Sequence, residues 1–482
     1  MSERNFYKKL LSHGESLLQK ILSFTRYVDW RWWDKPQKVS FVINLSIGIF
    51  ISIGFNFITH MQFMENFFNS TVDKLIKQEA IEFIKTSEKC FKQSSSDDRD
   101  CKKLRQKISS NIIFIDIDHD TYRRWGEPLF IPRNQIAHFL KLADMNNAKV
   151  VALDILLDYS SHNPGEDAEL AKVLADITKR KSKLKVIFPT SKSSVDSRIK
   201  KNIFDNIIDK NPNFYKGFPY SSFSKSDRVV RYIRYYDIAK NNDGENVVLW
   251  GVPVLSVALF TNDFFRLKEL EPVILEDLKH QRSKKYTVEL TNIGLLEIGN
   301  NELFSNRIRF ALLPPGTLND QGNLFAERIL PDEVEALQQE LKDKIVIIGT
   351  SSPDKEGWYP TPVGDMAGFY ILGNAMNVLI GDWQVRDAPL WIGLSLNLII
   401  IIFASYMLVY SRPSVARVVS TILAFIILIP TTYYCYRQYG FFINTIFLFL
   451  NLLIPVMAMG WHNIFVTIKR LIQTKMGFFV QH

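Results

Sequence analysis

The stretch Lys344–Thr350 reads KIVIIGT, so that four consecutive β-branched residues, IVII, stand between a lysine and a glycine. A short, continuous apolar run of this kind is typical of a strand that is buried on both faces of a sheet. Such strands occur mainly in parallel sheets whose faces are covered by helices. This run therefore predicts a core strand of an α/β domain.

Similar apolar runs precede this strand and alternate with stretches of helical periodicity. Strands are expected within 111–119, 149–156, 184–190 and 227–237, and helices at 133–147, 167–179, 249–260, 331–341 and 369–380. Apart from the helix at 331–341, residues 262–340 are expected to form loops, because they contain turn signals such as PPG and NDQG. Strands that alternate with helices of this length favour a mostly parallel sheet with helices on both faces.

Four long apolar stretches without Asp, Glu, Lys or Arg flank this domain. They are Val39–Thr59, Leu390–Tyr410, Val418–Tyr436 and Phe441–Val466. Each has about the 20 residues that a helix needs to cross a bilayer. We therefore expect an α-helical transmembrane bundle with one span before the domain and three after it.

Basic residues at the ends of these stretches indicate the orientation. Residues 1–40 carry eight Lys and Arg against four acids, the loop Ser411–Arg417 nets +2, and the tail after Val466 nets +3. Because Lys and Arg mark the cytoplasmic ends of spans, we expect both termini in the cytoplasm and the large domain outside it. The net charge of +9 follows this topology and does not indicate nucleic-acid binding.

This topology divides the chain into six parts. They are a cytoplasmic basic amphipathic segment (1–38), the first span (39–59), a stalk helix with a disulfide loop (60–110), the outer domain (111–388), three spans (389–466) and a short cytoplasmic tail (467–482). Segment 1–38 is expected either to lie on the inner membrane surface or to dock on a partner protein. Cys90 and Cys101 stand in a polar loop outside the membrane, where an oxidising compartment favours a disulfide between them.

Several short motifs follow one another in the outer domain. They are IDID at Ile115–Asp118, IPR at Ile131–Arg133, VVALDI at Val150–Ile155, DRVVR at Asp227–Arg231, KIVIIGTSSPD at Lys344–Asp354, YPTP at Tyr359–Pro362, and Gly368 followed by GNA at Gly373–Ala375. Their order, together with one span before and three after, resembles the type-2 CHASE domain, an extracytoplasmic sensory domain of bacterial receptors. The resemblance implies signal reception outside a bacterial inner membrane, with the large domain in the periplasm. In that family the domain is usually fused to a cytoplasmic adenylate cyclase, histidine kinase or Ser/Thr kinase.

Polar side chains gather where the expected strands end. In open α/β sheets, ligands bind beyond the carboxyl ends of the parallel strands. Asp118, Asp154, Thr350 and Asp354 stand at those ends, and Arg133 is expected close to the first of them. These side chains suit a small polar or anionic ligand; the alternative is that they only satisfy one another.

A second cluster at the same edge has two interpretations. His119 stands among Asp116, Asp118 and Asp120, and carboxylates at this spacing could hold a divalent cation. The alternative, which we favour, is that Asp116 and Asp118 cap the end of the sheet and hydrogen-bond to neighbouring loops. We therefore assign no metal site.

The sequence contains no catalytic motif of the common kinds. It has no Walker-type glycine loop, H-E-x-x-H, Gly-x-Ser-x-Gly or kinase catalytic loop. The segments 1–38 and 467–482 are also too short to fold an enzyme domain, which departs from the usual CHASE plan. We therefore expect no enzyme activity, no catalytic residue and no cofactor.

Two functions remain open. The first is a membrane sensor, or signal-transducing subunit, that acts through another membrane or cytoplasmic protein as a homo- or hetero-oligomer. The alternative is a structural or assembly subunit of a bacterial envelope complex that uses the sensory fold as a scaffold. The functions encoded by neighbouring genes would separate the two.

Reporter fusions test the topology. Fusions after Lys38 and after His482 should be active only with a cytoplasmic reporter, and a fusion at Asn213 only with a periplasmic one, since the basic residues place both ends inside. An active periplasmic reporter at the C-terminus would mean that the number of spans is wrong.

Overall fold

The computed structural model describes the outer domain and a few segments around it. The described residues are 70, 72–83, 110–180, 182–219, 222–223, 227–280, 286–291, 293–298, 307–312, 327–331, 334, 338–352, 357–381, 386–387, 430–436, 441–442 and six single positions between 392 and 402. The chain divides into two compact units. One comprises Glu65–Asp387 with Tyr436–Phe442, and the other Met1–Met64, Ala388–Cys435 and Ile443–His482.

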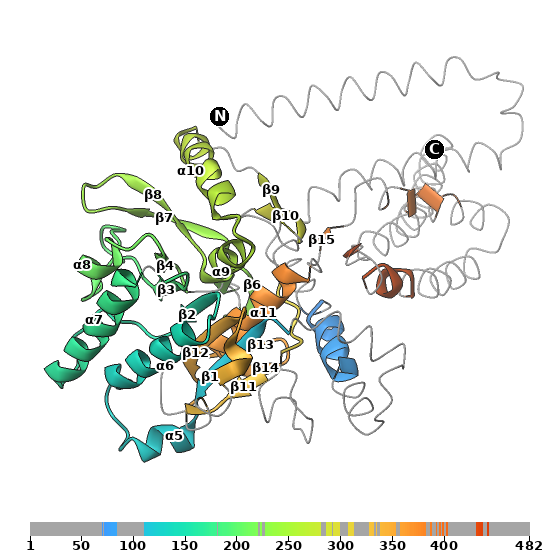
Figure 1. Cartoon of the computed structure of the whole chain (residues 1–482). Coiled ribbons are helices and arrows are strands. Elements are labelled where there is room, and N and C mark those ends of the chain that lie inside the picture. Colours follow the sequence, from blue (N-terminus) through green and yellow to red (C-terminus); the bar gives the residue numbers. More distant parts are fainter. Residues whose placement is uncertain are drawn as a thin grey trace, which may run out of the picture. The chain divides into compact units, whose positions relative to one another are not determined.

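Six strands form the central sheet of the first unit, in the order β11-β1-β12-β2-β3-β4 (Figure 1). Their bounds are β1 Ile112–Ile117, β2 Val150–Leu153, β3 Lys185–Pro189, β4 Phe214–Gly217, β11 Glu327–Ile329 and β12 Ile345–Thr350. All neighbouring pairs are parallel. The KIVIIGT strand is β12, which lies between β1 and β2 and is buried from Ile345 to Gly349. The predicted parallel α/β sheet is confirmed.

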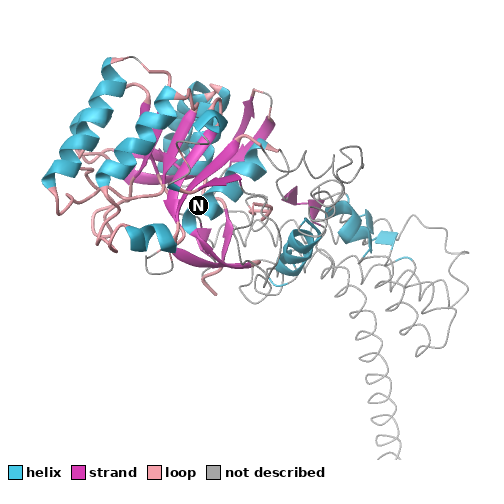
Figure 2. Ribbon diagram, turned by 60° about the horizontal axis from the view of Figure 1, so that its bottom comes forward, coloured by secondary structure: helices cyan, strands magenta, loops and turns pink. Residues whose placement is uncertain are grey.

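Helices cover both faces of the sheet (Figure 2). On one face, α6 (Arg133–Met145) and α7 (Pro164–Lys179) pack on alternate residues of the strands, including Ile113 and Ile115 of β1. On the other face lie α9 (Val252–Thr261) and α11 (Gly368–Ile380), with Phe114 of β1 in contact with the rings that begin α11. Successive residues of a strand point to opposite faces, which explains why the central strands β1, β2 and β12 are almost wholly apolar.

Two parts of the domain differ from the sequence prediction. The single strand expected at 227–237 is wrong: the segment forms β6 (Val230–Tyr232) and β7 (Tyr236–Lys240), which pair with different strands. The chain breaks between them because Gly251, just before α9, lies against the backbone there and donates a hydrogen bond to the Tyr235 carbonyl at 2.7 Å. The alternating side chains of residues 227–237 had predicted one continuous strand.

The loops expected in 262–340 are also wrong in part. Phe264–Lys279 forms the helix α10, which buries Leu267 and Ile274, although Pro272 lies inside it. Proline inside a helix removes one backbone hydrogen bond, yet the helix forms; the turn signals behind the loop prediction, PPG and NDQG, lie further along the chain. A hairpin follows α10, formed by β9 (Tyr286–Leu290) and β10 (Gly294–Ile298).

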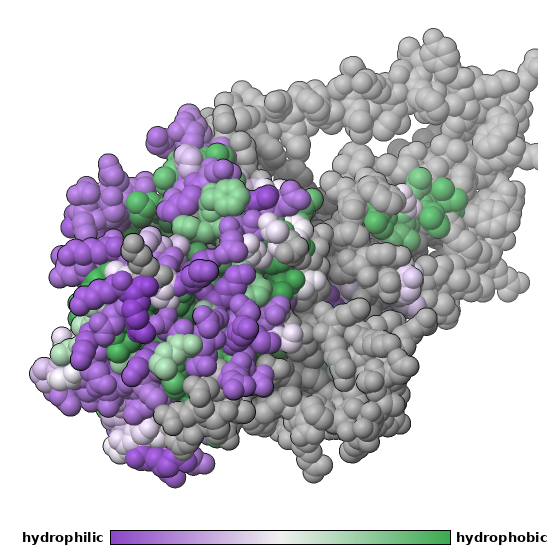
Figure 3. Space-filling model, viewed as in Figure 1, coloured by the Kyte–Doolittle hydropathy of each residue, from purple (hydrophilic) through white to green (hydrophobic). Residues whose placement is uncertain are grey.

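Short elements complete the described structure. They are the helices α5 (His119–Arg124), α8 (Asp205–Ile208) and η3 (Gln338–Leu341), and the strands β5 (Ser222–Phe223), β8 (Asn246–Trp250), β13 (Trp358–Thr361), β14 (Gly364–Ala367), β15 (Arg386–Asp387) and β16 (Phe441–Phe442). Residues 72–83 are helical and are called the stalk helix below. Figure 3 shows a mostly hydrophilic face of the domain, with smaller hydrophobic areas between the polar side chains.

Several predictions fall on other residues. No helix in the described part of the chain is long and apolar enough to cross a membrane. The four predicted spans lie mostly outside the described residues, and the segment 1–38, the tail 467–482, Cys90, Cys101 and Asp354 lie wholly outside them.

Close packing of α11 on the sheet leads to a prediction about stability. A Cβ atom at Gly373 of α11 would lie 2.2 Å from the Phe114 ring of β1. Gly373→Ala should therefore force this ring or the helix to move and destabilise the protein by about 1–3 kcal/mol.

Thermal unfolding of the full chain in detergent measures this effect. Gly165→Ala, in the exposed first turn of α7, is the matched control because its Cβ would meet only the Asn163 side chain, at 3.2 Å. Equal stabilities of the two variants would contradict the close packing of α11.

Candidate functional site

The start of α11 lies over one row of residues at the carboxyl edge of the sheet. Asp116 of β1 pairs with Gly349 of β12, and Asp154 follows Leu153, which pairs with Ile348. Asp116, Gly349 and Asp154 therefore stand side by side on the face that carries α11, and we call them the edge row. Gly349 lacks a side chain where the Phe369 ring packs, because a Cβ would lie 2.6 Å from it.

Asp154 is a half-buried carboxylate of the edge row. One carboxylate oxygen lies close to Gly368, the first residue of α11, where an added Cβ would be 3.2 Å away, and Tyr359 of β13 packs at the same place. Burial raises the pKa of Asp154 to about 7. This acid therefore changes charge near neutral pH, directly beside the start of a buried helix.

Asp116 has a different role in the same row. It is fully buried and accepts a hydrogen bond of 2.9 Å from the Tyr370 hydroxyl of α11. One polar contact thus fixes the first turn of α11 to the central strand β1. Asp116 and Asp154 flank Gly349, so that the start of α11 touches both acids of the row.

The predicted ligand residues Asp118 and Thr350 lie at the ends of adjacent strands. The Asp118 side chain accepts a hydrogen bond from the Thr121 amide at 2.9 Å and caps α5. The Thr350 hydroxyl donates to the Ile117 carbonyl at 2.8 Å. These bonds favour the capping interpretation of the acidic cluster, and among the described residues no group of His, Cys, Asp and Glu could hold a metal ion.

Arg133, the first residue of α6, contacts the first turn of α7 and the loop between β2 and α7. Its backbone amide donates to Glu166 at 3.0 Å, its guanidinium lies 3.8 Å from Asp167, and its Nη2 donates to the carbonyls of Leu156 and Tyr159. Burial lowers the pKa of Arg133, and the two acids partly offset that effect. Glu166 occupies the start of α6, where an anion would otherwise bind. The ligand role of Arg133 stays a prediction.

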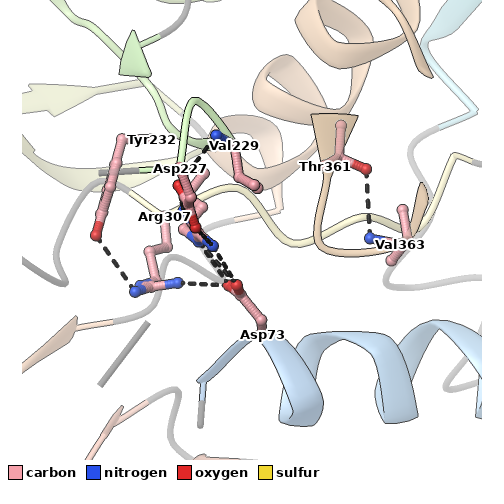
Figure 4. A network of polar contacts seen from close by, with 8 residues as sticks. Asp73, Asp227, Val229, Tyr232, Arg307, Thr361 and Val363 are labelled. Carbon is pink, nitrogen blue, oxygen red and sulfur yellow. Dashed lines mark hydrogen bonds and ion pairs between the residues drawn. The ribbon is translucent and has the colours of Figure 1, made fainter. Parts of the chain in front are cut away.

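A cluster of buried arginines outside the predicted site holds the stalk helix to the domain (Figure 4). Asp73 of the stalk helix accepts hydrogen bonds from Arg231 at 2.6–2.9 Å and from Arg307 at 3.1 Å. Arg231 also binds Asp227 twice, at 2.6 and 2.7 Å, and Arg307 donates to the Tyr232 hydroxyl at 3.3 Å. We call Asp73, Asp227, Arg231 and Arg307 the stalk clamp.

The two arginines of the stalk clamp are buried, and its two aspartates balance their charges. Arg307 is fully buried, and the side chain of Arg231 is 4% exposed. Burial disfavours the charge on Arg231, but the hydrogen bonds that Arg231 donates to Asp227 and Asp73 outweigh this effect, so that the pKa of Arg231 is raised. Sequence reasoning named Arg231 only within a motif and missed Asp73 and Arg307, because nothing local marks two residues 234 positions apart as partners.

The helix α11 contacts both the edge row and the segment that contains Arg307. Asn374 of α11 is fully buried, and its Oδ1 accepts hydrogen bonds from the amides of Ala311 and Leu312, both at 2.8 Å. This holds the segment Arg307–Leu312 against α11. A displacement of α11 at the edge row therefore has a direct route to Arg307 and the stalk helix.

Comparison with known families assigns the domain. The model of the CHASE2 domain matches residues 81–410. The chain belongs to the CHASE2 family. This confirms the resemblance to type-2 CHASE domains, and CHASE2 domains are extracytoplasmic sensory domains. No curated protein and no solved structure matches the chain.

The CHASE2 match includes the edge row and the arginines of the stalk clamp. Asp73 lies before its first residue, and the match continues to residue 410, the end of the predicted second span. The stalk clamp therefore joins the CHASE2 domain to the chain that precedes it.

The raised pKa of Asp154 predicts how stability changes with pH. Its folded-state pKa of about 7 exceeds the value of about 4 expected in an unfolded chain. Between these values the unfolded state binds fewer protons than the folded state, so the stability contributed by Asp154 falls as pH rises. Asp154→Asn should abolish this loss and gain stability over the natural protein, on the order of a few kcal/mol between about pH 4 and pH 8.

Thermal unfolding of the full chain at several pH values checks this expectation. Asp120→Asn, which removes an exposed carboxylate from α5, controls for the loss of one charge. A stability difference between Asp154→Asn and the natural protein that stays constant with pH would disprove the raised pKa.

Proposed function

We propose that this chain is the sensing subunit of a bacterial membrane signalling complex, with its CHASE2 domain in the periplasm and four spans in the inner membrane. It acts through a partner protein and has no enzyme activity or cofactor of its own. Membership of a sensory-domain family supports the sensing role. The one-and-three arrangement of apolar stretches and their basic flanks support the topology.

The observation that carries this proposal is the stalk clamp. The stalk helix follows the first predicted span in the chain, and Asp73 holds it to two buried arginines of the domain. Removing one partner of a buried ion pair leaves an uncompensated charge and typically costs about 3–5 kcal/mol. The stalk helix therefore moves together with the domain, and a change in the domain shifts the first span.

The carboxyl edge of the sheet, where a ligand is proposed to bind, is connected through α11 to the stalk clamp. A polar or anionic ligand beside Asp154 would bind where α11 begins, and Asn374 connects α11 to the Arg307–Leu312 segment. The other end of α11 lies shortly before the predicted second span. A ligand that favours one position of α11 would thereby change the relation of the first and second spans, because a ligand shifts a conformational equilibrium by its differential affinity.

We propose that the protein that responds to this movement is another membrane or cytoplasmic protein, in a homo- or hetero-oligomer. Contacts with it would come from segment 1–38 and from the spans, whose asparagines suit helix–helix association. Affinity purification of the full chain after gentle detergent extraction should recover such a partner. A monodisperse monomer that copurifies with nothing would argue against this proposal.

Breaking the stalk clamp tests the sensing role. Asp73→Asn leaves Arg231 and Arg307 without the shared carboxylate and should destabilise the attachment of the stalk helix by about 3 kcal/mol. We expect this variant to keep its partner and a protease-resistant domain, but to fail to complement a deletion strain. Lys77→Gln, at an exposed position of the same helix, is the matched control and should complement fully.

The outcome also separates sensing from scaffolding. A scaffold needs the domain to be present and folded, whereas a sensor needs the domain to move the span. Full complementation by a folded Asp73→Asn protein would therefore contradict the sensing role and favour the envelope scaffold.

A further inference from the structure

The end of the predicted third span and the start of the predicted fourth span belong to the same compact unit as the CHASE2 domain. This unit comprises Glu65–Asp387 together with Tyr436–Phe442. We call Tyr436–Phe442 the docking loop; its described residues, Tyr436 and Phe441–Phe442, contact the domain although about fifty residues separate them from it in the chain. Two sets of contacts account for this attachment.

The first set centres on Glu79 of the stalk helix. Its carboxylate accepts a hydrogen bond from the Tyr436 hydroxyl at 2.9 Å and another from Arg309 Nε at 3.0 Å, and Arg309 Nη2 donates a further bond. The Arg309 guanidinium also lies over the Tyr436 ring, 4.9 Å from its centroid. Glu79, Arg309 and Tyr436 thus contact one another, and they come from the stalk helix, the domain and the docking loop.

These three side chains are shielded from water. Tyr436 is 2% exposed, and the side chains of Arg309 and Glu79 are 3% and 13% exposed. Charge-assisted hydrogen bonds in such surroundings are stronger than those at the surface. Detaching the docking loop would also expose the Tyr436 ring to water, which opposes the separation.

The second set is a short piece of parallel sheet. β16 (Phe441–Phe442) of the docking loop pairs with β15 (Arg386–Asp387), which lies between α11 and the predicted second span. Arg386 pairs with Phe441, and Asp387 with Phe442. The docking loop is therefore held at its start by Glu79 and Arg309, and at its end by β15.

We propose that the docking loop is an output element, which carries movements of the CHASE2 domain to the predicted third and fourth spans. This inference rests on the proposed sensing function and extends it. Chain continuity alone links the domain only to the first and second spans. Through Glu79, a movement of the stalk helix also displaces Tyr436, and through β15 a movement of α11 displaces β16.

Paired cysteines test the docking itself. In the full chain with Cys435→Ser, Arg386→Cys and Phe441→Cys place two thiols on paired positions of adjacent strands. With a protease site inserted into the loop 411–417, oxidation in membranes should keep the two fragments together until a reductant is added. Each single cysteine variant is the matched control. Absence of the crosslink in a protein whose domain resists protease would overturn the docking.

A rescue tests the output role. Tyr436→Ala removes the hydroxyl and the ring, and should lower both the initial crosslinking rate, by about tenfold, and complementation. Tyr436→Phe keeps the ring and should have a smaller effect. The Arg386→Cys and Phe441→Cys disulfide should restore complementation to Tyr436→Ala, because it reattaches the docking loop covalently.

The outcomes distinguish the two proposals. If Tyr436→Ala complements fully, or if the disulfide forms and does not restore complementation, the output role is wrong. If Asp73→Asn still abolishes complementation in that case, the sensing function stands without the docking loop. Full complementation by all these variants would remove the sensing function as well.

Discussion

Asp73 lies between two buried guanidinium groups, and it is one of two carboxylates, with Glu79, that attach the stalk helix to the CHASE2 domain. Arg307 is fully buried, and a buried charge that loses its partner is strongly destabilising. The constraint acts on both partners. If the stalk helix separates from the domain, the arginines lose the Asp73 carboxylate and remain as buried charges or become exposed. We propose that a sensory domain held in this way moves the stalk helix when it changes position.

The segment Arg307–Leu312 connects the stalk helix to the helix α11. Asn374 fixes it to α11, while Arg307 and Arg309 fix the stalk helix to it. The first turn of α11 packs over the edge row, where Asp154 changes charge near neutral pH. The contacts therefore run without a gap from the carboxyl edge of the sheet to the stalk helix. Such a path carries a signal only if its parts have two arrangements.

The sequence predicted those parts of the fold in which local pattern and tertiary structure agree. The continuous apolar runs of β1, β2 and β12 identified the sheet because strands covered on both faces contain few polar residues. The helix α10, with Pro272 inside it, was not predicted, and the break before β7 depends on a distant glycine, Gly251. The edge positions were predictable from strand order, whereas the burial of Arg133 and the pairing of Asp73 with Arg307 arise from contacts between distant segments.

Hydrogen exchange of the full chain, measured residue by residue, tests the rigid attachment of the stalk helix most directly. Amides that open only when the whole domain unfolds exchange most slowly, whereas a locally detached segment exchanges faster. If the stalk clamp holds as described, the amides of residues 72–83 will be protected to the same degree as those of α11. Exchange of the stalk helix that is faster by orders of magnitude, while α11 stays protected, would contradict a stalk that moves with the domain.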